Sequence, residues 1–475
     1  MTRDNLARAK QVVDAALSGE EEGQQELATC LERMWEEDQD SLREFFREVH
    51  PADSAQVLEL FSPQRASDML RLLSLNSQAR IFHYISPQME NKFAQVLSRK
   101  EFARIISAMS HDERADLFNR LSPEQQEEIL PALAHAERED IRKLASYPEG
   151  SAGAVMTSDY AALTPDLRAR EALEKLRREA PDKETIYQCY VIDEERRLVG
   201  VISLRELLIA PPRSQVGKIM NDKPIYASAQ DDGEHVANLM AKYDLMAIPV
   251  INGNNQLVGI VTFDDVQDII QDEATEDFHR IGSVSGPGES LVGVSFKDVS
   301  PWLLIQKRFP WLLVLVFVNL LSGAGIAYFE RTIEAVVVLV AFLPLLIDSA
   351  GNAGSQSSTL MVRALATGDV QMKDWGQLLV KEVGIALVLG AGMAAAVSLV
   401  GIYRGGMDIA FVVALSMTIV VLFGSLVGCF LPFILALLRI DPATASVPLI
   451  TSIADVGGIL IYFSIATLIL DIPLP

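Results

Sequence analysis

Five long apolar stretches in the last third of the chain constrain its fold more than any other feature. A helix needs about 20 apolar residues to cross the ~30 Å hydrocarbon core of a bilayer. Inside that core every backbone N–H and C=O group must be paired within the protein, which helices achieve. We therefore predict an all-α membrane domain of five transmembrane helices over residues 301–475, with spans at 310–329, 334–352, 378–402, 409–438 and 443–470.

Two regions of this membrane domain contain polar residues at membrane depth. Residues 344–363 read PLLIDSAGNAGSQSSTLMVR, and Asp455 lies in an otherwise apolar segment between Leu449 and Ile465. A lone carboxylate on a membrane helix costs about 3 kcal/mol, and the last span contains no Lys or Arg to pair with it. A permeation pathway for a cation accounts for this acidity. The alternative for Asp455 is a position near the membrane interface.

The first 300 residues carry nearly all of the net charge. Residues 301–475 have 8 Lys and Arg against 10 Asp and Glu, a net charge of −2, which leaves −20 of the total −22 for residues 1–300. These residues contain no spanning segment, so we expect them to form a cytoplasmic body. Nucleic acids bind basic surfaces, so the acidity argues against a nucleic-acid partner and favours cations.

Residues 1–147 contain a short repeat that predicts an all-α superhelical domain. Serine recurs every 12 residues and is a good helix N-cap; in three repeats proline follows it at the first helical position. Helices of about ten residues are unstable alone, so we expect them to stack. The serines are Ser62, Ser74, Ser86, Ser98, Ser110 and Ser122, and the apolar residues seven positions later are Met69, Ile81, Phe93, Ile105, Leu117 and Ile129.

Residues 148–263 contain two copies of a β-α-β-β-α pattern. LVGVISLREL at 198–207 matches LVGIVTFDDV at 257–266. This tandem pair resembles CBS domains, which have an α+β fold. In that family the Ser or Thr and the acidic residue of the closing motif often hold the ribose of an adenine nucleotide. The resemblance thus implies ATP as a ligand of Ser203, Thr262 and Asp265; the alternative is a strand–turn–helix in which Ser203 and Thr262 are N-caps.

Residues 264–300 predict an acidic connecting helix, DDVQDIIQDEATEDFHRIG, followed by a loose linker. Asp265, Asp268, Asp272 and Glu276 share one face of this helix, where like charges repel each other. A divalent cation between this face and a second acidic surface would relieve the repulsion, whereas a solvated helix is the alternative. Such a surface is available at three aspartates: Asp112, Asp116 and Asp244.

Basic residues at the ends of the spans predict the orientation of the chain in the membrane. Cytoplasmic loops carry an excess of Lys and Arg. With the N-terminus in the cytoplasm, six basic residues lie inside and two outside; the six are Lys307, Arg308, Arg363, Lys373, Lys381 and Arg439, and the two are Arg331 and Arg404. We therefore expect a multi-pass protein of the cytoplasmic (inner) membrane with a cytoplasmic N-terminus.

The order of these regions resembles the MgtE family of magnesium channels, and the likeness runs over essentially the whole chain. It is most specific in four segments: AGNAGSQSSTLMVRALATGD (350–369), DPATASVPLITSIADVGGILIYF (441–463), YDLMAIPV (243–250) and DEATEDFHR (272–280). Mg²⁺ gives up its water reluctantly and is held by one or two carboxylates. The resemblance implies that Asp455 is the pore ligand and that Asn352 lies beside the same ion.

Asp348 does not follow from the resemblance, because this position is often uncharged in the family. It is either an additional carboxylate at the pore mouth or a helix-terminal aspartate at the cytoplasmic interface. The resemblance does imply that cytoplasmic Mg²⁺ binds between the N-terminal, CBS and connecting regions and closes the pore. By position, the regulatory ligands are Asp112, Asp116, Asp244, Asp265, Asp268, Glu273, Glu276 and Asp277.

We therefore expect a homodimeric magnesium-selective channel in a lipid bilayer, closed by cytoplasmic Mg²⁺, and not an enzyme. None of the six histidines lies beyond His279, so the membrane half has no HExxH zinc motif and no Ser–His pair. Two alternatives stay open. One is a CBS-regulated transporter of another divalent cation, such as Mn²⁺ or Co²⁺. The other is a membrane signalling module without ion flux.

Overall fold

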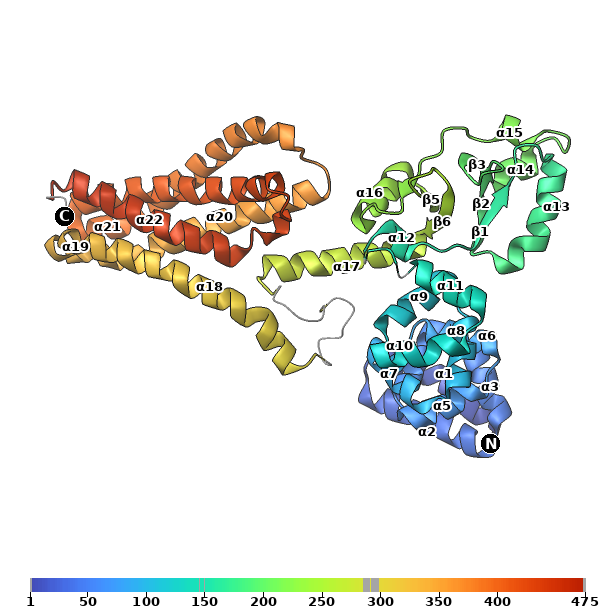
Figure 1. Cartoon of the computed structure of the whole chain (residues 1–475). Coiled ribbons are helices and arrows are strands. Elements are labelled where there is room, and N and C mark those ends of the chain that lie inside the picture. Colours follow the sequence, from blue (N-terminus) through green and yellow to red (C-terminus); the bar gives the residue numbers. More distant parts are fainter. Residues whose placement is uncertain (1, 145, 149, 285–290, 292–298, 473–475) are drawn as a thin grey trace. The chain divides into compact units, whose positions relative to one another are not determined.

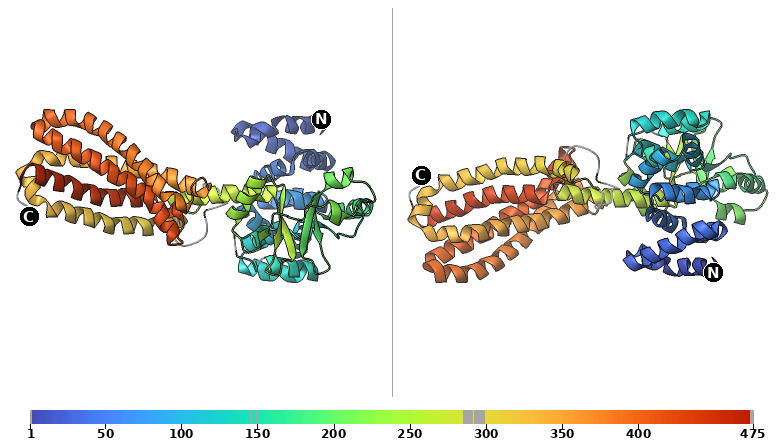
Figure 2. Two further views of the ribbon diagram at one scale, coloured as in Figure 1. Left: turned by 90° about the horizontal axis from the view of Figure 1, so that it is seen from above. Right: turned by 90° about the horizontal axis from the view of Figure 1, so that it is seen from below.

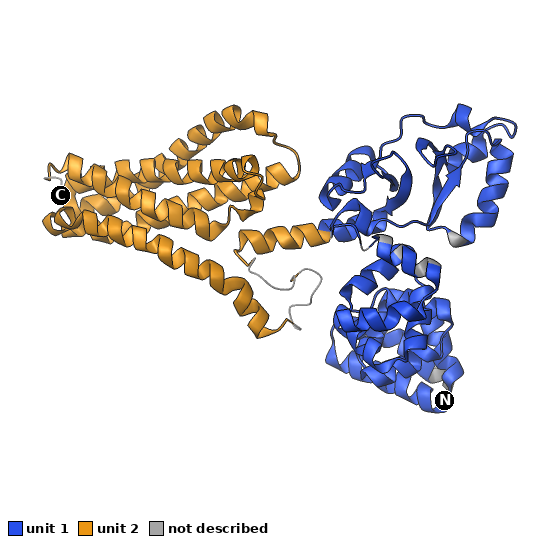
Figure 3. Cartoon of the chain, viewed as in Figure 1, with its two compact units in different colours: residues 1–270 blue, residues 271–475 orange. Residues whose placement is uncertain are grey.

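The computed structural model describes residues 2–144, 146–148, 150–284, 291 and 299–472. The chain divides into two compact units, residues 1–270 and 271–475 (Figure 3). Most of the predicted linker after the connecting helix, at 285–290 and 292–298, lies outside the described residues. The domain limits at residues 147, 263 and 300 stay predictions.

The first unit begins with a stack of short helices (Figure 1). Ser62, Ser74, Ser86, Ser98, Ser110 and Ser122 are the N-cap residues of α5 to α10, as predicted. The apolar residues seven positions after these serines are all buried in one hydrophobic core. The helices are α1 (Thr2–Leu17), α2 (Glu21–Glu37), α3 (Gln39–Glu48), α4 (Pro51–Glu59), α5 (Pro63–Arg71), α6 (Leu75–Phe82), α7 (Pro87–Val96), α8 (Arg99–Ser107), α9 (His111–Arg120), α10 (Pro123–Ile129), η1 (Leu130–Ala132) and α11 (His135–Leu144).

Alternate helices of this stack pack on each other: α4 on α6, α6 on α8, and α5 on α7. These helices therefore pack against their second neighbours along the chain. Helices this short gain their stability from such packing rather than from propensity. The predicted all-α superhelical region is confirmed.

The rest of the first unit contains two three-stranded sheets of the same topology. In each, the first strand pairs in parallel with the second, which pairs antiparallel with the third. The first repeat has α12 (Ala152–Val155), β1 (Tyr160–Leu163), α13 (Ala169–Glu179), η2 (Ala180–Asp182), β2 (Thr185–Ile192), β3 (Leu198–Ser203) and α14 (Leu204–Ile209). The second has α15 (Val216–Ile219), β4 (Ala227–Ser228), α16 (Gly233–Tyr243), β5 (Ala247–Ile251), β6 (Leu257–Thr262) and the start of α17 (Phe263–Ile281).

The two sheets share a small core. Tyr160 and Tyr190 of the first repeat are buried with Ala247, Leu257 and Ile260 of the second. The Tyr160 hydroxyl donates a hydrogen bond to the Leu257 carbonyl at 3.1 Å. The repeated topology and the shared core confirm the predicted tandem α+β pair.

The second unit is a bundle of long apolar helices, in which α20, α21 and α22 pack on one another (Figures 1 and 2). Among the described residues, four helical segments are long and apolar enough to cross a membrane. The elements are α18 (Pro301–Tyr328), α19 (Glu330–Ala335), η3 (Val337–Phe342), α20 (Leu343–Ala366), η4 (Met372–Asp374), α21 (Trp375–Leu437), η5 (Pro442–Thr444) and α22 (Val447–Ile469).

The third and fourth predicted spans both lie in α21, which is a hairpin and not one rod. Gly406 has φ 81° and ψ −172°, values outside the helical region. A Cβ atom on Gly401 would meet Ala410, and one on Gly390 would meet Thr418. The two halves of α21 therefore run antiparallel, and the four segments provide five crossings.

The second predicted span, residues 334–352, ends 14 residues too early, because the candidate span in the structure runs from Val337 to Ala366. In the structure residues 337–342 form η3, and the long helix α20 starts at Leu343 and continues to Ala366. The prediction ended the span where polar residues begin. The helix continues because its small residues pack: a Cβ on Gly354 would lie 2.7 Å from the Gly424 carbonyl oxygen, and a Cβ on Gly428 would overlap Gly354. Close backbone packing at small residues is typical of membrane helices.

Candidate ion pathway and acidic cluster

One side of α20 carries polar residues along its whole length. They are spaced three or four residues apart and so share a helix face. All are exposed in the single chain. We call this set the polar face of α20; it consists of Asp348, Asn352, Gln356, Thr359 and Arg363. Polar side chains on a membrane helix line a wet cavity or contact protein rather than lipid.

Two members of the polar face are bonded to each other. The Asn352 amide nitrogen donates a hydrogen bond to the Asp348 carboxylate at 3.0 Å. Because the donor is the amide nitrogen, the amide oxygen of Asn352 can still coordinate a cation. Asp348 therefore lies one turn from Asn352 on the polar face, within the polar segment 344–363 that the sequence analysis identified.

Asp455 lies beside this face. It is partly exposed on α22, which packs closely on α20, since a Cβ on Gly351 would lie 3.0 Å from the Thr451 side chain. Asp455 and Asp348 are near enough to interact electrostatically. The structure thus brings together the three predicted pore residues, which come from segments about a hundred residues apart. Their role as ion ligands stays a prediction.

The glycines of this region do something other than line the pathway. Gly354 faces α21 and Gly351 faces α22. Both allow the helix backbones to approach closely. The exposed side chains that carry oxygen atoms on this part of α20, Asp348 and Asn352, are thus the candidates for contact with an ion.

A second group of acidic residues gathers in the first unit. We call Asp112, Asp116, Glu184, Asp265 and Asp268 the acidic cluster. Asp112 and Asp116 are one turn apart on α9, and Asp265 and Asp268 lie on the first turns of α17. Asp112 is buried and its Oδ1 atom has no hydrogen-bond partner; Asp265 is half-buried, and Asp116, Glu184 and Asp268 are exposed to solvent.

The electrostatics of the acidic cluster disfavour the charged form of its carboxylates. Burial raises the pKa of Asp112 above its usual range. Partial desolvation, and then the charge of Asp112, raise the pKa of Asp265 to about 8. Desolvation, opposed by Arg120, raises the pKa of Asp116 to about 6. Carboxylates that crowd together disfavour each other's charged form, and a cation between them removes that penalty.

The sequence did not single out Glu184, which immediately precedes β2. Desolvation, followed by the charges of Asp112 and Asp264, raises the pKa of Glu184 to about 7. Glu184 has no spacing relationship to α9 or α17, so only the folded structure places it in the cluster.

His83 and Glu113 at the edge of the cluster were also missed. The His83 Nδ1 atom lies 2.9 Å from a Glu113 carboxylate oxygen. This hydrogen bond raises the pKa of His83, although burial opposes the shift. Burial alone would raise the pKa of Glu113, but the bond to His83 holds it below its usual value.

The other predicted regulatory residues lie elsewhere. Asp244 is exposed and ends α16 in a left-handed conformation, with φ 51°. Glu273, Glu276 and Asp277 follow on α17, but in the second unit. Desolvation raises the pKa of Asp277, while Arg280 opposes the shift. The structure therefore brings together Asp112, Asp116, Asp265 and Asp268, and leaves the other four as predictions.

Of the residues predicted to hold a nucleotide, Ser203 caps a helix and Thr262 is bonded to Asp265 in the first turn of α17. The Ser203 hydroxyl donates to the Glu206 carboxylate at 2.7 Å and accepts from the Glu206 N–H at 3.1 Å, a capping box. The Thr262 hydroxyl donates to Asp265 at 2.6 Å. These bonds within the chain are enough to account for a Ser at position 203 and a Thr at position 262, so ATP binding stays a prediction.

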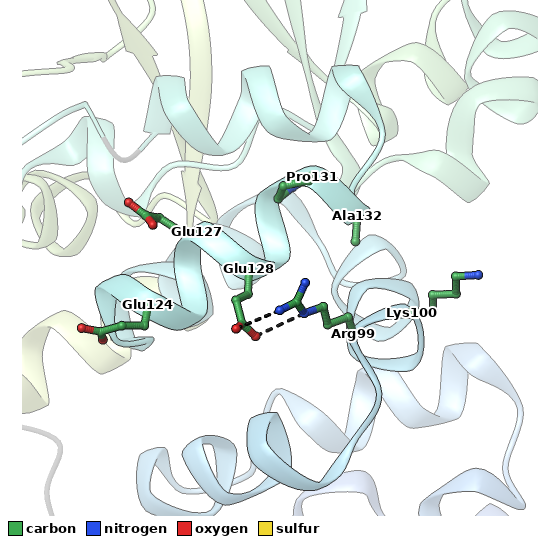
Figure 4. A pocket seen from close by; sticks show the side chains of 7 residues that line it. All are labelled: Arg99, Lys100, Glu124, Glu127, Glu128, Pro131 and Ala132. Carbon is green, nitrogen blue, oxygen red and sulfur yellow. Dashed lines mark hydrogen bonds and ion pairs between the residues drawn. The ribbon is translucent and has the colours of Figure 1, made fainter.

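A shallow hollow of about 540 Å³ lies between α8 and α10 (Figure 4). Arg99 reaches across to Glu128, with 2.8 Å between their nearest charged atoms. None of the predicted site residues lines this hollow. The hollow is lined by both basic and acidic side chains, of which Arg99 and Glu128 form an ion pair, whereas the acidic cluster consists of carboxylates alone.

Comparisons with known proteins give the class of this protein. A model described as a divalent cation transporter matches residues 343–465, and a model of the MgtE intracellular N domain matches residues 49–150. The CBS domain model matches residues 152–213 and 216–272. The apolar helices, the polar face and these matches define a multi-pass cation transporter of the membrane, and not an enzyme.

The relatives identify the family. A magnesium transporter MgtE of Thermus thermophilus is 43% identical over 333 residues, which cover 70% of this chain and 72% of that protein. One of Bacillus subtilis is 37% identical over 69% of this chain and 71% of that protein. The cytosolic domain of an MgtE Mg²⁺ channel in complex with ATP aligns with a TM-score of 0.48 and 37% identity, over 50% of this chain and 97% of that chain. The chain belongs to the MgtE family.

Proposed function

We propose that the chain is one protomer of a homodimeric, magnesium-selective channel in the cytoplasmic membrane, with its N-terminus in the cytoplasm. The observation that carries this proposal is the exposed polar face of α20 beside Asp455 on α22. Against lipid such a face would be unfavourable. A second copy of the chain placed against it would enclose a wet pathway and remove the exposure.

The chemistry of the face suits hydrated Mg²⁺. Mg²⁺ keeps several waters and binds through one or two carboxylates. Asp455 would attract the ion, the Asn352 amide oxygen would accept hydrogen bonds from its water shell, and Asp348 would raise the local concentration of cations. Among the described residues, no group of three or more His, Cys, Asp and Glu side chains could hold a metal ion, either along the pathway or in the acidic cluster, so an ion at either place would keep part of its water shell. A loose site lets an ion leave as readily as it enters.

No energy source beyond the membrane is needed for uptake. The membrane potential contributes about 2.3 kcal/mol per charge per 100 mV, and Mg²⁺ carries two charges. Passive flow into a negative cytoplasm is therefore favoured.

The acidic cluster would serve as the sensor of cytoplasmic Mg²⁺. A cation between α9 and the start of α17 would satisfy the Asp112 Oδ1 atom and relieve the repulsion around Asp265. Binding can shift a channel toward its closed state only if the ion prefers that state. In this proposal Mg²⁺ binds more tightly when the acidic residues of the cluster lie together, and that arrangement belongs to the closed channel. The resemblance extends the sensor to Asp244, Glu273, Glu276 and Asp277.

The CBS pair would provide a site for ATP at Ser203, Thr262 and Asp265. This part of the proposal rests on the family match and on the motif. ATP binding to the purified chain, measured by calorimetry, should weaken when Thr262 is changed to Val. If the Thr262→Val variant binds ATP as tightly as wild type, Thr262 does not contact the nucleotide.

Ion flux into proteoliposomes tests the proposed function. The purified chain should carry Mg²⁺ and discriminate against Mn²⁺, Co²⁺ and Ca²⁺ in the same preparation. A preference for Mn²⁺ or Co²⁺ would support the alternative of another divalent substrate. No flux of any cation, from protein that is folded and inserted, would support a signalling module.

A further inference from the structure

A buried ion pair links α7 to α9 beside the acidic cluster. Glu90 lies on α7 and is only 1% exposed. The Arg120 guanidinium, at the end of α9, donates two hydrogen bonds to the Glu90 carboxylate, from Nε at 3.1 Å and from Nη2 at 2.9 Å. A bidentate pair of this kind is among the stronger polar contacts in proteins, because both partners are charged and their shapes match. Neither residue belongs to the acidic cluster or to the predicted Mg²⁺ ligands.

The position of Arg120 in the sequence favours a different partner. Asp116 precedes Arg120 by one turn of α9, and both side chains are exposed. An acidic residue four positions before a basic one is the favourable arrangement for an ion pair on a helix surface. The charge of Arg120 does reach Asp116, since it opposes the rise in the pKa of Asp116. The guanidinium nevertheless bonds to Glu90, on another helix.

Burial explains why Arg120 bonds to Glu90. A carboxylate that is removed from water is costly unless a cation and hydrogen-bond donors compensate it. Burial raises the pKa of Glu90, and the charge of Arg120 opposes that rise. Asp116 is exposed, so water can hydrogen-bond to it instead. Arg120 is therefore held by the carboxylate that loses more without it.

The other arginine of α9 also points away from the acidic cluster. Arg114 lies two residues after Asp112 and is 5% exposed. Its guanidinium donates hydrogen bonds to the carbonyls of Ile106 and Met109, at 3.1 and 3.0 Å, around the end of α8. Both arginines of α9 thus bond to groups outside the cluster, and its carboxylates stay available to a cation from solution.

We propose that Glu90 is a positioning residue that holds Arg120 away from Asp116, so that the acidic cluster requires a metal cation, and not an arginine, as its counter-ion. Without the negative charge of Glu90, Arg120 would pair with Asp116 one turn away and neutralise one carboxylate of the cluster. Mg²⁺ would then bind more weakly, because a dication is attracted less to a site of lower negative charge. This role of Glu90 rests on the proposed function, in which the acidic cluster binds regulatory Mg²⁺.

The dependence of stability on Mg²⁺ in the full chain tests the role of Glu90. Trp35, in the first unit, reports urea unfolding by its fluorescence when the other three tryptophans are changed to Phe. A ligand that binds the folded state raises the free energy of unfolding by an amount set by the ratio of its concentration to its dissociation constant. The rise with Mg²⁺ concentration therefore gives the apparent Kd for Mg²⁺ separately from the stability without Mg²⁺.

Glu90→Gln removes the charge of the side chain and keeps its size. This variant should raise the apparent Kd for Mg²⁺ by about two- to fivefold, the effect of one new exposed ion pair at Asp116. The double variant Glu90→Gln/Arg120→Gln should return the Kd to the wild-type value, because the released arginine is then absent. If Glu90 served only for packing, both variants would be less stable at every Mg²⁺ concentration with an unchanged Kd, and the proposed role would be wrong.

Glu128→Gln is the matched control. Glu128 is also contacted by both ends of an arginine fork, with Arg99 Nε at 3.2 Å and Nη2 at 2.8 Å, in the hollow between α8 and α10 (Figure 4). The same charge is removed from the same helix stack, but none of the predicted site residues lines this hollow. The apparent Kd for Mg²⁺ should therefore equal that of wild type.

Asp116→Asn identifies the group that the released arginine reaches. This variant should itself bind Mg²⁺ more weakly, and adding Glu90→Gln to it should cause no further loss, because Arg120 then finds no carboxylate at position 116. If Glu90→Gln has the wild-type Kd, or if Arg120→Gln does not rescue it, Glu90 does not have this role, although the sensor itself stands. If Mg²⁺ does not stabilise wild type, the acidic cluster is not the sensor and both proposals are wrong.

Discussion

The polar face of α20 and the acidic cluster of the first unit use the same kinds of side chain in opposite ways. On the membrane helices, Asp348 is exposed and bonded to the Asn352 amide, and Asp455 is partly exposed. In the cluster, Asp112 is buried and its Oδ1 atom has no hydrogen-bond partner, and desolvation together with the charge of Asp112 raises the pKa of Asp265 to about 8. The two carboxylates on the membrane helices have few acidic neighbours, whereas those of the acidic cluster are crowded together.

In the proposed function, this difference would separate the residues that pass an ion from those that sense it. A pathway must bind a cation weakly enough to release it, which accessible carboxylates beside water can do. A sensor must change its state when the ion binds, and crowded carboxylates provide the required free energy because they repel each other until a cation arrives. We infer that the number of neighbouring carboxylates, rather than residue type, separates the two sets.

The largest effect should come from the pathway. Asp455→Asn removes the only carboxylate of α22 and should lower Mg²⁺ flux into proteoliposomes by about 100-fold, since a lost ligand is worth roughly 3 kcal/mol in passage. Asp408→Asn, at an exposed site near the bend of α21, should transport normally. Normal flux through Asp455→Asn would remove Asp455 from the pathway.

The next effect concerns the stability of the first unit as a function of pH. The pKa values of Asp265, Glu184 and Asp116 are raised to about 8, 7 and 6. Between about pH 5.5 and pH 8 the folded unit therefore binds more protons than the unfolded chain, and its free energy of unfolding falls as pH rises. Saturating Mg²⁺ should abolish this fall by taking the place of the protons.

The measurement can use Trp35, one of four tryptophans, which lies under the Arg65 guanidinium at 5.1 Å. A variant in which Trp302, Trp311 and Trp375 are changed to Phe leaves Trp35 as the fluorescent reporter of urea unfolding in the full chain. If the free energy of unfolding rises between about pH 5.5 and pH 8 without Mg²⁺, the raised pKa values of the acidic cluster are wrong.

The smallest effect should come from Asp348. Asp348→Asn keeps a side chain that can bond Asn352 and removes only a charge beside the pathway, so flux should fall by about two- to tenfold. This result would place Asp348 at the pore. Unchanged flux would assign it to the membrane interface, and a loss as large as that of Asp455→Asn would contradict the proposed division of roles.

The regular parts of the fold could be predicted from sequence because their signals are local. Ser98 and Ser122 mark helix starts through bonds to residues three positions away. The hairpin within α21 follows from two apolar stretches around Gly406. The continuation of α20 to Ala366 was missed, because it depends on packing against Gly424 and Gly428, which are distant in sequence.

The candidate sites were predictable only in part, for the same reason. Asp455 and Asn352 stand out because polar residues are rare in apolar spans. Glu184 and His83 look like ordinary surface residues, and their place in or beside the acidic cluster depends on how α9, β2 and α17 meet. Tertiary packing, not local pattern, decides which carboxylates lie together.

The central claim is that the acidic cluster senses Mg²⁺ while the polar face conducts it. The direct test is the current in inside-out patches at increasing cytoplasmic Mg²⁺, comparing wild type with Asp112→Asn/Asp265→Asn. The double variant should conduct as well as wild type at low Mg²⁺ and stay open at Mg²⁺ concentrations about tenfold above those that close wild type, because each neutralised carboxylate weakens the cation site. Closure at the wild-type concentration, or loss of conduction, would contradict the account.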